Sequence, residues 1–174
     1  MDRHRIEQRV RIVLAGEIAG RWCDRTIRVE RHEAAHAVVG HLYGRHCHIC
    51  TAVPERGMAG HVSWTAEAEA AAGDVPSDRR QALILLAALN PGAGWRRIRS
   101  EYKRLHLETC DLLRNEIVSY RVNWLAFELR DRSTLSGAEV ASAIAAADAD
   151  MRTSWRRRYW DEALPQLQQL EATT

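Results

Sequence analysis

The 174-residue sequence has no apolar run long enough to cross a membrane. Its longest apolar stretch, residues 82–89, falls far short of the roughly 18 to 20 apolar residues that a membrane span needs. The first residues are charged and are not followed by the apolar segment of a secretory signal, so we expect a soluble, cytoplasmic protein. The sequence also lacks a G-x-x-x-x-G-K-[S/T] pattern, which excludes the phosphate-binding loop of a P-loop ATPase from this chain.

A large excess of charge of one sign is absent as well. Lys and Arg number 25 and Asp and Glu number 23, which gives a net charge of +2. Proteins that bind nucleic acid through its phosphates are usually much more basic, so no nucleic-acid partner is expected. Hydrophobic residues make up 46% of the chain, which is typical of a globular protein. We expect one domain over residues 1–150 and a C-terminal helix or tail, residues 151–174, that packs on it.

Cysteine is scarce, with only Cys23, Cys47, Cys50 and Cys110. Cys47 and Cys50 have the C-x-x-C spacing that suits zinc binding or redox chemistry. A second C-x-x-C pair is missing, so a four-cysteine zinc site would need Cys23 and Cys110 to come from distant parts of the chain. We therefore expect free thiols.

The spacing of apolar residues predicts a mainly α protein (α+β) with a small β-sheet. Helices are predicted over residues 2–20, 26–43, 77–89, 95–129 with a kink, 136–147 and 151–170, with Ser77 and Ser136 as caps. Short strands are predicted over residues 46–53 and 60–64, joined by a turn at 54–57. Residues 67–72 fit either a helical turn or a loop, and residues 133–137 read as a connector.

Histidine is concentrated in one region, with six of the eight lying between His32 and His61. Within it, His32-Glu33-Ala34-Ala35-His36 matches the H-E-x-x-H pattern. Residues i and i+4 of a helix share one face, so the two imidazoles can bind one Zn²⁺ while Glu33 takes a proton from the attacking water. A catalytic zinc usually has three protein ligands and one open position, so a third ligand is needed.

Spacing alone does not identify that third ligand. The candidates are His41, His46, His48 and His61 close to the motif, and Asp74, Asp78, Glu108, Asp111 and Glu116 farther along the chain.

Four segments resemble, in the same order, the peptidase domain of the FtsH-type ATP-dependent zinc metalloproteases. Residues 32–39 resemble that family's HEAGHA motif with its aliphatic continuation, and residues 51–62 resemble a strand, a Pro-Arg-Gly turn and a second strand. Residues 110–113 look like the family's Asp-Leu helix, and residues 134–140 are similar to its closing Thr-Leu-x-Gly-x-Glu segment.

The resemblance implies a helical, zincin-like peptidase domain with a small sheet beside the motif helix. It implies one Zn²⁺ per chain, held by His32, His36 and Asp111, with Glu33 as the general base in peptide-bond hydrolysis. Asp111 lies 79 residues after His32, close to the separation in the family. We expect a peptide or protein substrate, which could pair with an edge strand at Gly60, His61 and Val62.

The chain also departs from the family. It has neither the ATPase module nor the membrane anchor, so the implied hydrolysis is ATP-independent in this chain, with a homo-oligomer or a separate ATPase as possible partners. The family's Ala-Gly-Arg-x-Ala-Glu helix has its best match at residues 14–19, before the motif rather than after it. Two alternatives are a non-catalytic binding or regulatory module that retains the fold, and a metal-dependent hydrolase of another bond. An intact Glu33 favours an enzyme, because a binding module has no need of it.

Overall fold

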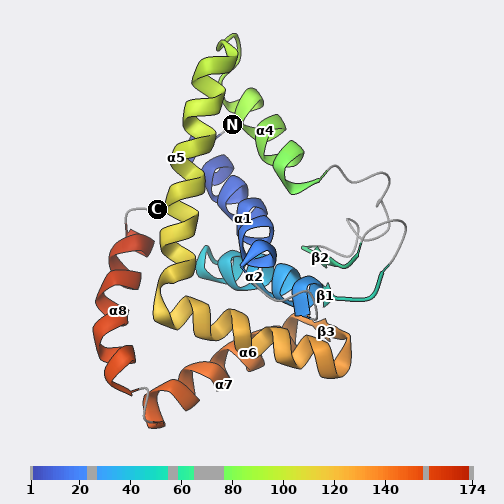
Figure 1. Cartoon of the computed structure of the whole chain (residues 1–174), viewed down its shortest axis with the longest axis vertical. Coiled ribbons are helices and arrows are strands. Elements are labelled where there is room, and N and C mark those ends of the chain that lie inside the picture. Colours follow the sequence, from blue (N-terminus) through green and yellow to red (C-terminus); the bar gives the residue numbers. More distant parts are fainter. Residues whose placement is uncertain (1, 23–26, 55–58, 65–76, 155–156, 173–174) are drawn as a thin grey trace.

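The fold class predicted from the sequence, mainly helical with a small β-sheet, is confirmed in a computed structural model (Figure 1). The structure describes residues 2–22, 27–54, 59–64, 77–154 and 157–172. This part of the chain forms helices α1 (Arg3–Arg21), α2 (Arg28–Leu42), α4 (Asp78–Leu89), α5 (Trp95–Arg114), α6 (Glu116–Arg132), α7 (Gly137–Thr153) and α8 (Arg157–Ala172), and strands β1 (Ile49–Thr51), β2 (His61–Ser63) and β3 (Thr134–Ser136).

The helix predicted over residues 95–129 is two helices, α5 and α6, that meet at Asn115. The buried Asn115 side chain accepts hydrogen bonds from the backbone N–H groups of Ile117 and Val118, so it caps α6. Its amide nitrogen donates to the carbonyl oxygen of Ala163 on α8 at 3.0 Å. A cap of this kind stabilises a helix by about 1 kcal/mol, and here it also fixes the corner between α5 and α6.

The two predicted serine caps have different outcomes. Ser136 caps α7 in a full capping box, because its hydroxyl accepts from the Glu139 backbone N–H and the Glu139 carboxylate accepts from the Ser136 backbone. Ser77 does precede α4, but its side chain makes no capping hydrogen bond. The connector predicted at residues 133–137 contains strand β3, which was not predicted.

The sheet is antiparallel, with the strand order β2-β1-β3. Cys50 on β1 is opposite Val62 on one side and Leu135 on the other. Paired residues share a face of a sheet, and Cys50 and Leu135 are fully buried, so this face belongs to the core. Within the described residues β2 has one strand partner and so lies at an edge, as predicted.

The core forms around α2, which packs against α1 on one side and α6 on the other. Helix α8 packs against α6 and α7 through Trp160, Ala163 and Leu167, which belong to the same buried cluster. The helix predicted to begin at residue 151 begins at Arg157, because residues 151–153 continue α7. Among the helices of the described segments, none has the length and apolar character to span a bilayer.

Some predicted features lie outside the described residues. They are Cys23, Asp74, most of the turn at 54–57 and the segment 67–72.

Candidate metal centre

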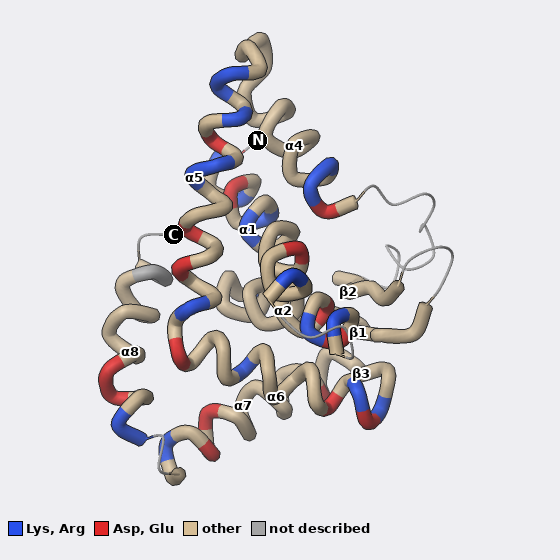
Figure 2. Tube along the Cα trace, viewed as in Figure 1, with Lys and Arg blue, Asp and Glu red and all other residues tan. Residues whose placement is uncertain are grey.

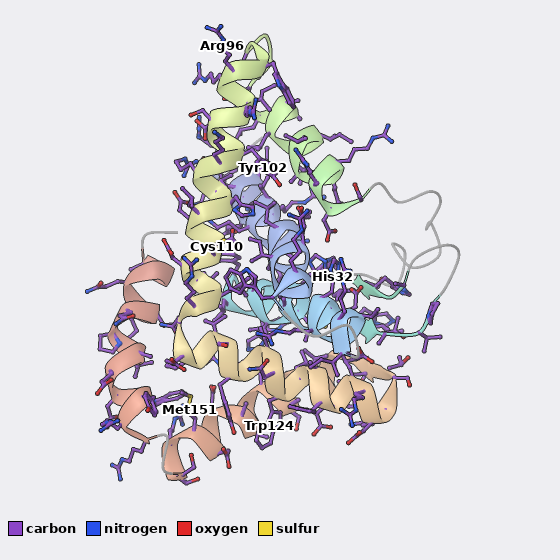
Figure 3. All side chains as sticks on the ribbon, viewed as in Figure 1. His32, Arg96, Tyr102, Cys110, Trp124 and Met151 are labelled. Carbon is purple, nitrogen blue, oxygen red and sulfur yellow. The ribbon has the colours of Figure 1, made fainter. Side chains whose placement is uncertain are left out.

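His32 and His36 lie one turn apart on α2, and both approach Asp78 at the beginning of α4. Figure 3 labels His32 at this site. Their Nε2 atoms are 3.1 Å apart, and their rings meet edge to face. Asp78, the first residue of α4, completes the group: its Oδ2 atom lies 3.0 Å from Nε2 of His32 and 3.4 Å from Nε2 of His36. Among the residues that the structure describes, this is the one group of three or more His, Cys, Asp or Glu side chains arranged to hold a metal ion.

The distances within this group fit a small cation with tetrahedral coordination. Two ligand atoms that bind one Zn²⁺ at about 2.0–2.1 Å in a tetrahedral arrangement are about 3.3–3.4 Å apart. The three separations between the ligand atoms of His32, His36 and Asp78 range from 3.0 to 3.4 Å. The donor set of two imidazoles and one carboxylate is also one that zinc accepts.

The ring of His36 is held by the backbone of α1. Its Nδ1 atom lies 2.7 Å from the carbonyl oxygen of Ile12. A carbonyl oxygen only accepts hydrogen bonds, so Nδ1 carries the proton. In the neutral ring Nε2 then has its lone pair free for a metal. The group that orients this ring is therefore a main-chain carbonyl of α1.

Helix α1 can approach His36 this closely because residue 16 is glycine. A Cβ atom built on Gly16 would lie 2.2 Å from Nε2 of His36, which is far too close for two atoms that are not bonded. Gly16 belongs to the segment 14–19 that resembles the family's Ala-Gly-Arg-x-Ala-Glu helix. This segment lies on α1, which packs directly on the motif helix α2.

The charges of the site favour a bound cation. Burial lowers the pKa of His36, but the hydrogen bond and charge of Asp78 outweigh burial and raise it to about 9. Burial raises the pKa of the Asp78 carboxyl, but hydrogen bonds from His32 and His36 outweigh it and bring the pKa well below its usual range. Without a metal, a proton therefore sits among these three groups, and a cation can take its place.

Glu33 is buried beside this group, with only 4% of its surface exposed. Burial raises the pKa of its carboxyl, and the charges of His36 and His32 oppose that rise. A Cβ atom on Gly60 would lie 3.0 Å from Cγ of Glu33 and 2.6 Å from the carbonyl oxygen of Thr51. The chain therefore needs a glycine at position 60, and strand β2 begins directly beside Glu33.

Asp111, the third ligand implied by the family resemblance, does not join the two histidines. It lies on α5 with its side chain 67% exposed and forms an ion pair with Arg114 at 3.0 Å. The inward side of α5 is formed by residues such as Leu105 and Leu112, and Asp111 is not on it. Asp78, one of the acidic candidates named from the sequence, takes the place expected for Asp111.

Other candidate ligands have different surroundings. Glu108 forms ion pairs with Arg11 at 2.6 Å and with Arg104 at 2.8 Å. His41 and His46 lie against each other, with ring centroids 5.3 Å apart. His61 is opposite Thr51 in the sheet, so its side chain is on the face opposite to Cys50 and Val62. Neither Glu116 nor His48 is part of the group formed by His32, His36 and Asp78.

Cys47 and Cys50 are free thiols in the structure, and both are buried. Burial raises the pKa of the Cys47 thiol to about 11 and that of the Cys50 thiol well above its ordinary value. The C-x-x-C pair therefore lacks the exposed, ionised thiols that redox chemistry needs.

We expect Cys47 and Cys50 to resist alkylation in the folded protein. At pH 8 a thiol with a pKa of about 11 is roughly 0.1% ionised, compared with about a quarter for a free cysteine, so Cys47 should react about two hundredfold more slowly. Peptide mapping after timed iodoacetamide treatment measures the rate, and the same treatment in denaturant provides the control. Labelling at equal rates in both conditions would contradict the buried thiols described above.

Comparisons with known proteins do not place the chain in a family: no protein-family model, no curated protein and no solved structure matches it.

Proposed function

We propose that this protein is a zinc-dependent metallopeptidase whose zinc is held by His32, His36 and Asp78. One observation carries the proposal: three ligand atoms converge at separations suited to tetrahedral zinc, next to a buried carboxylate that is not itself part of the group. A site that only stores or senses a metal has no use for this second carboxylate. The H-E-x-x-H spacing and the resemblance to FtsH-type peptidases support the same function.

Zinc held by three protein ligands would polarise a substrate carbonyl and make a coordinated water more acidic. The chain's own residues supply the other parts of the reaction. The carboxylate of Glu33 accepts a proton from the water that attacks the peptide carbonyl, and then delivers it to the departing amine nitrogen. The Ile12 carbonyl keeps the His36 ring oriented through its Nδ1–H, and Gly16 leaves the space that the ring occupies.

An extended peptide is the substrate that fits the surroundings of Glu33. Strand β2 lies at the edge of the sheet and begins next to Glu33, at Gly60. A peptide that pairs with the backbone of residues 60–62 would gain main-chain hydrogen bonds, which tolerate many side-chain sequences. Its scissile bond would then run past the carboxylate of Glu33. Pairing with a strand edge requires an extended backbone, so we propose loosely folded or extended substrates.

Removal and return of the metal tests this proposal. We expect the purified chain to contain about one zinc per molecule and to cleave a mixture of unstructured peptides. Dialysis against a chelator should abolish cleavage, and one equivalent of Zn²⁺ should restore it, with new peptide termini identified by mass spectrometry. A chain that binds zinc but cleaves no peptide would favour the non-catalytic module instead, and cleavage of another bond type would identify a different hydrolase.

A further inference from the structure

Helices α4 and α5 form a hairpin that projects from the rest of the molecule (Figure 1). The first part of α4 reaches the metal centre through Asp78, whereas the loop 90–94 and the beginning of α5 form the far end, where Arg96 lies (Figure 3). The hairpin, residues 78–103, is anchored on its inner side by Ala82 and Leu86 of α4, which are fully buried, and α4 packs against α1.

The hairpin carries several arginines that have no ionic partner among the described residues. It has six basic and two acidic residues, whereas the whole chain has a net charge of only +2. Its exposed arginines, which make no ion pair with any carboxylate in the described part of the chain, are Arg79, Arg80, Arg96, Arg97 and Arg99. By contrast Arg104, just beyond the hairpin, contacts Glu7, Glu101 and Glu108. Figure 2 shows the basic residues on both helices of the hairpin.

An apolar stripe lies on the outer face of the same hairpin. Ile84 is 54% exposed and Trp95 is 59% exposed, and both are large side chains. Ala87 and Ala88 are also exposed, and their spacing from Ile84 puts all three on one face of α4. Pro91, in the loop that follows α4, is exposed as well. Because the opposite face of α4 is already buried against α1, this stripe is a second apolar surface that faces solvent. Exposed apolar surface rimmed by charge is typical of an interaction site.

The combination of these features fits one class of partner best. An acidic peptide would use the arginines but not the aliphatic stripe, and a nucleic acid would favour a chain with a larger net positive charge. A lipid surface uses all of them: arginines bind anionic headgroups, tryptophan prefers the membrane–water interface, and aliphatic side chains enter the acyl boundary. We propose that the α4–α5 hairpin binds the surface of an anionic lipid bilayer, with Trp95 and Ile84 at headgroup level and exposed arginines of both helices against lipid phosphates.

Vesicle binding tests this inference independently of any peptidase activity. The full chain is sedimented with vesicles of phosphatidylcholine alone, or with about one-third phosphatidylglycerol, at about 0.1 M salt. We expect at least a tenfold preference for the anionic vesicles. Each arginine close to such a surface contributes about fivefold to partitioning, so Arg96→Gln with Arg97→Gln should lower it by about 25-fold. Trp95→Ala should lower partitioning several-fold and remove the change in tryptophan fluorescence that vesicles cause.

A variant elsewhere on the surface provides the matched control. Arg9→Gln with Arg130→Gln changes two exposed arginines outside the hairpin, so it should leave partitioning within about twofold of the unchanged chain. Circular dichroism establishes that each variant is folded. Equal losses in the control and in the hairpin variant, or no preference for anionic vesicles, would refute the proposal. So would hairpin-dependent binding of an acidic peptide or a single-stranded oligonucleotide by a chain that binds no vesicles.

Discussion

Replacing Glu33 by glutamine should reduce peptide cleavage by about 10²- to 10⁴-fold while the chain keeps its zinc. Glutamine has nearly the same shape as glutamate, so it can occupy the buried position beside Gly60 without disturbing α2 or β2. Its amide cannot accept the proton of the attacking water, and for this reason the chemical step should fail although the metal site is intact. Peptide cleavage and zinc content measured on the same preparation separate these two effects.

Glu30 offers a matched control, because it is a second glutamate on α2, in the first turn of the helix. Glu30→Gln removes the same charge from the same helix, and cleavage should stay within about twofold of that of the unchanged chain, because Glu30 is neither a proposed zinc ligand nor the proposed base. If Glu33→Gln cleaves peptides as fast as Glu30→Gln, Glu33 is not the general base, and the proposed mechanism fails even if zinc is essential.

Replacing Asp78 by alanine should weaken zinc binding by at least about 100-fold. Loss of a group that only orients a metal ligand costs about 10- to 100-fold in affinity, and Asp78 is proposed to contact the metal directly. Its loss also leaves the two imidazoles without the carboxylate that balances the charge of the cation. Competition with a chromophoric zinc chelator measures the affinity of the variant and of the unchanged chain.

Asp111→Ala tests which carboxylate is the third zinc ligand: Asp78, as the geometry indicates, or Asp111, as the family resemblance implied. Asp111 is exposed and pairs with Arg114 three residues away, so its removal should leave zinc affinity unchanged. Asp78 begins α4, where a carboxylate also stabilises the helix by about 0.3–1 kcal/mol. Thermal unfolding of both variants without metal therefore shows whether a loss of zinc affinity reflects misfolding. If Asp111→Ala bound zinc weakly and Asp78→Ala kept its zinc affinity, the third ligand would be Asp111 and not Asp78.

Sequence periodicity predicted the helices more accurately than the sheet, for a physical reason. Helices α1, α2 and α4 rest on local hydrogen bonds and on apolar residues three and four apart, both of which a short window contains. Strand β3 is three residues long and exists because Thr134 pairs with Thr51, 83 residues away in the sequence. No local pattern marks such a strand, and residues 133–137 look like any connector between helices.

The candidate site also combines residues whose relation is local in the sequence with residues that only packing brings together. His32, Glu33 and His36 share one helical turn, so their relation follows from helix geometry alone. The third ligand depends on which later helix returns to α2, and that is decided by packing. Asp78 also has an ordinary local explanation, because acidic residues are common in the first turn of a helix after a break. The carbonyl of Ile12 leaves no trace in the sequence at all, since every residue has one.

Gly16 of α1 gives the site a signature that the H-E-x-x-H pattern lacks. The three residues of that pattern specify only one turn of a helix. A pattern that also requires a glycine where α1 crosses the His36 ring, and an aspartate at the start of α4, is much more specific. Here the order is Gly16, fifteen residues, His32-Glu33-x-x-His36, forty-one residues and Asp78. Genomes can be searched for this order, with variable spacers, and a chain in which a small residue replaces His36 should be free to replace the glycine.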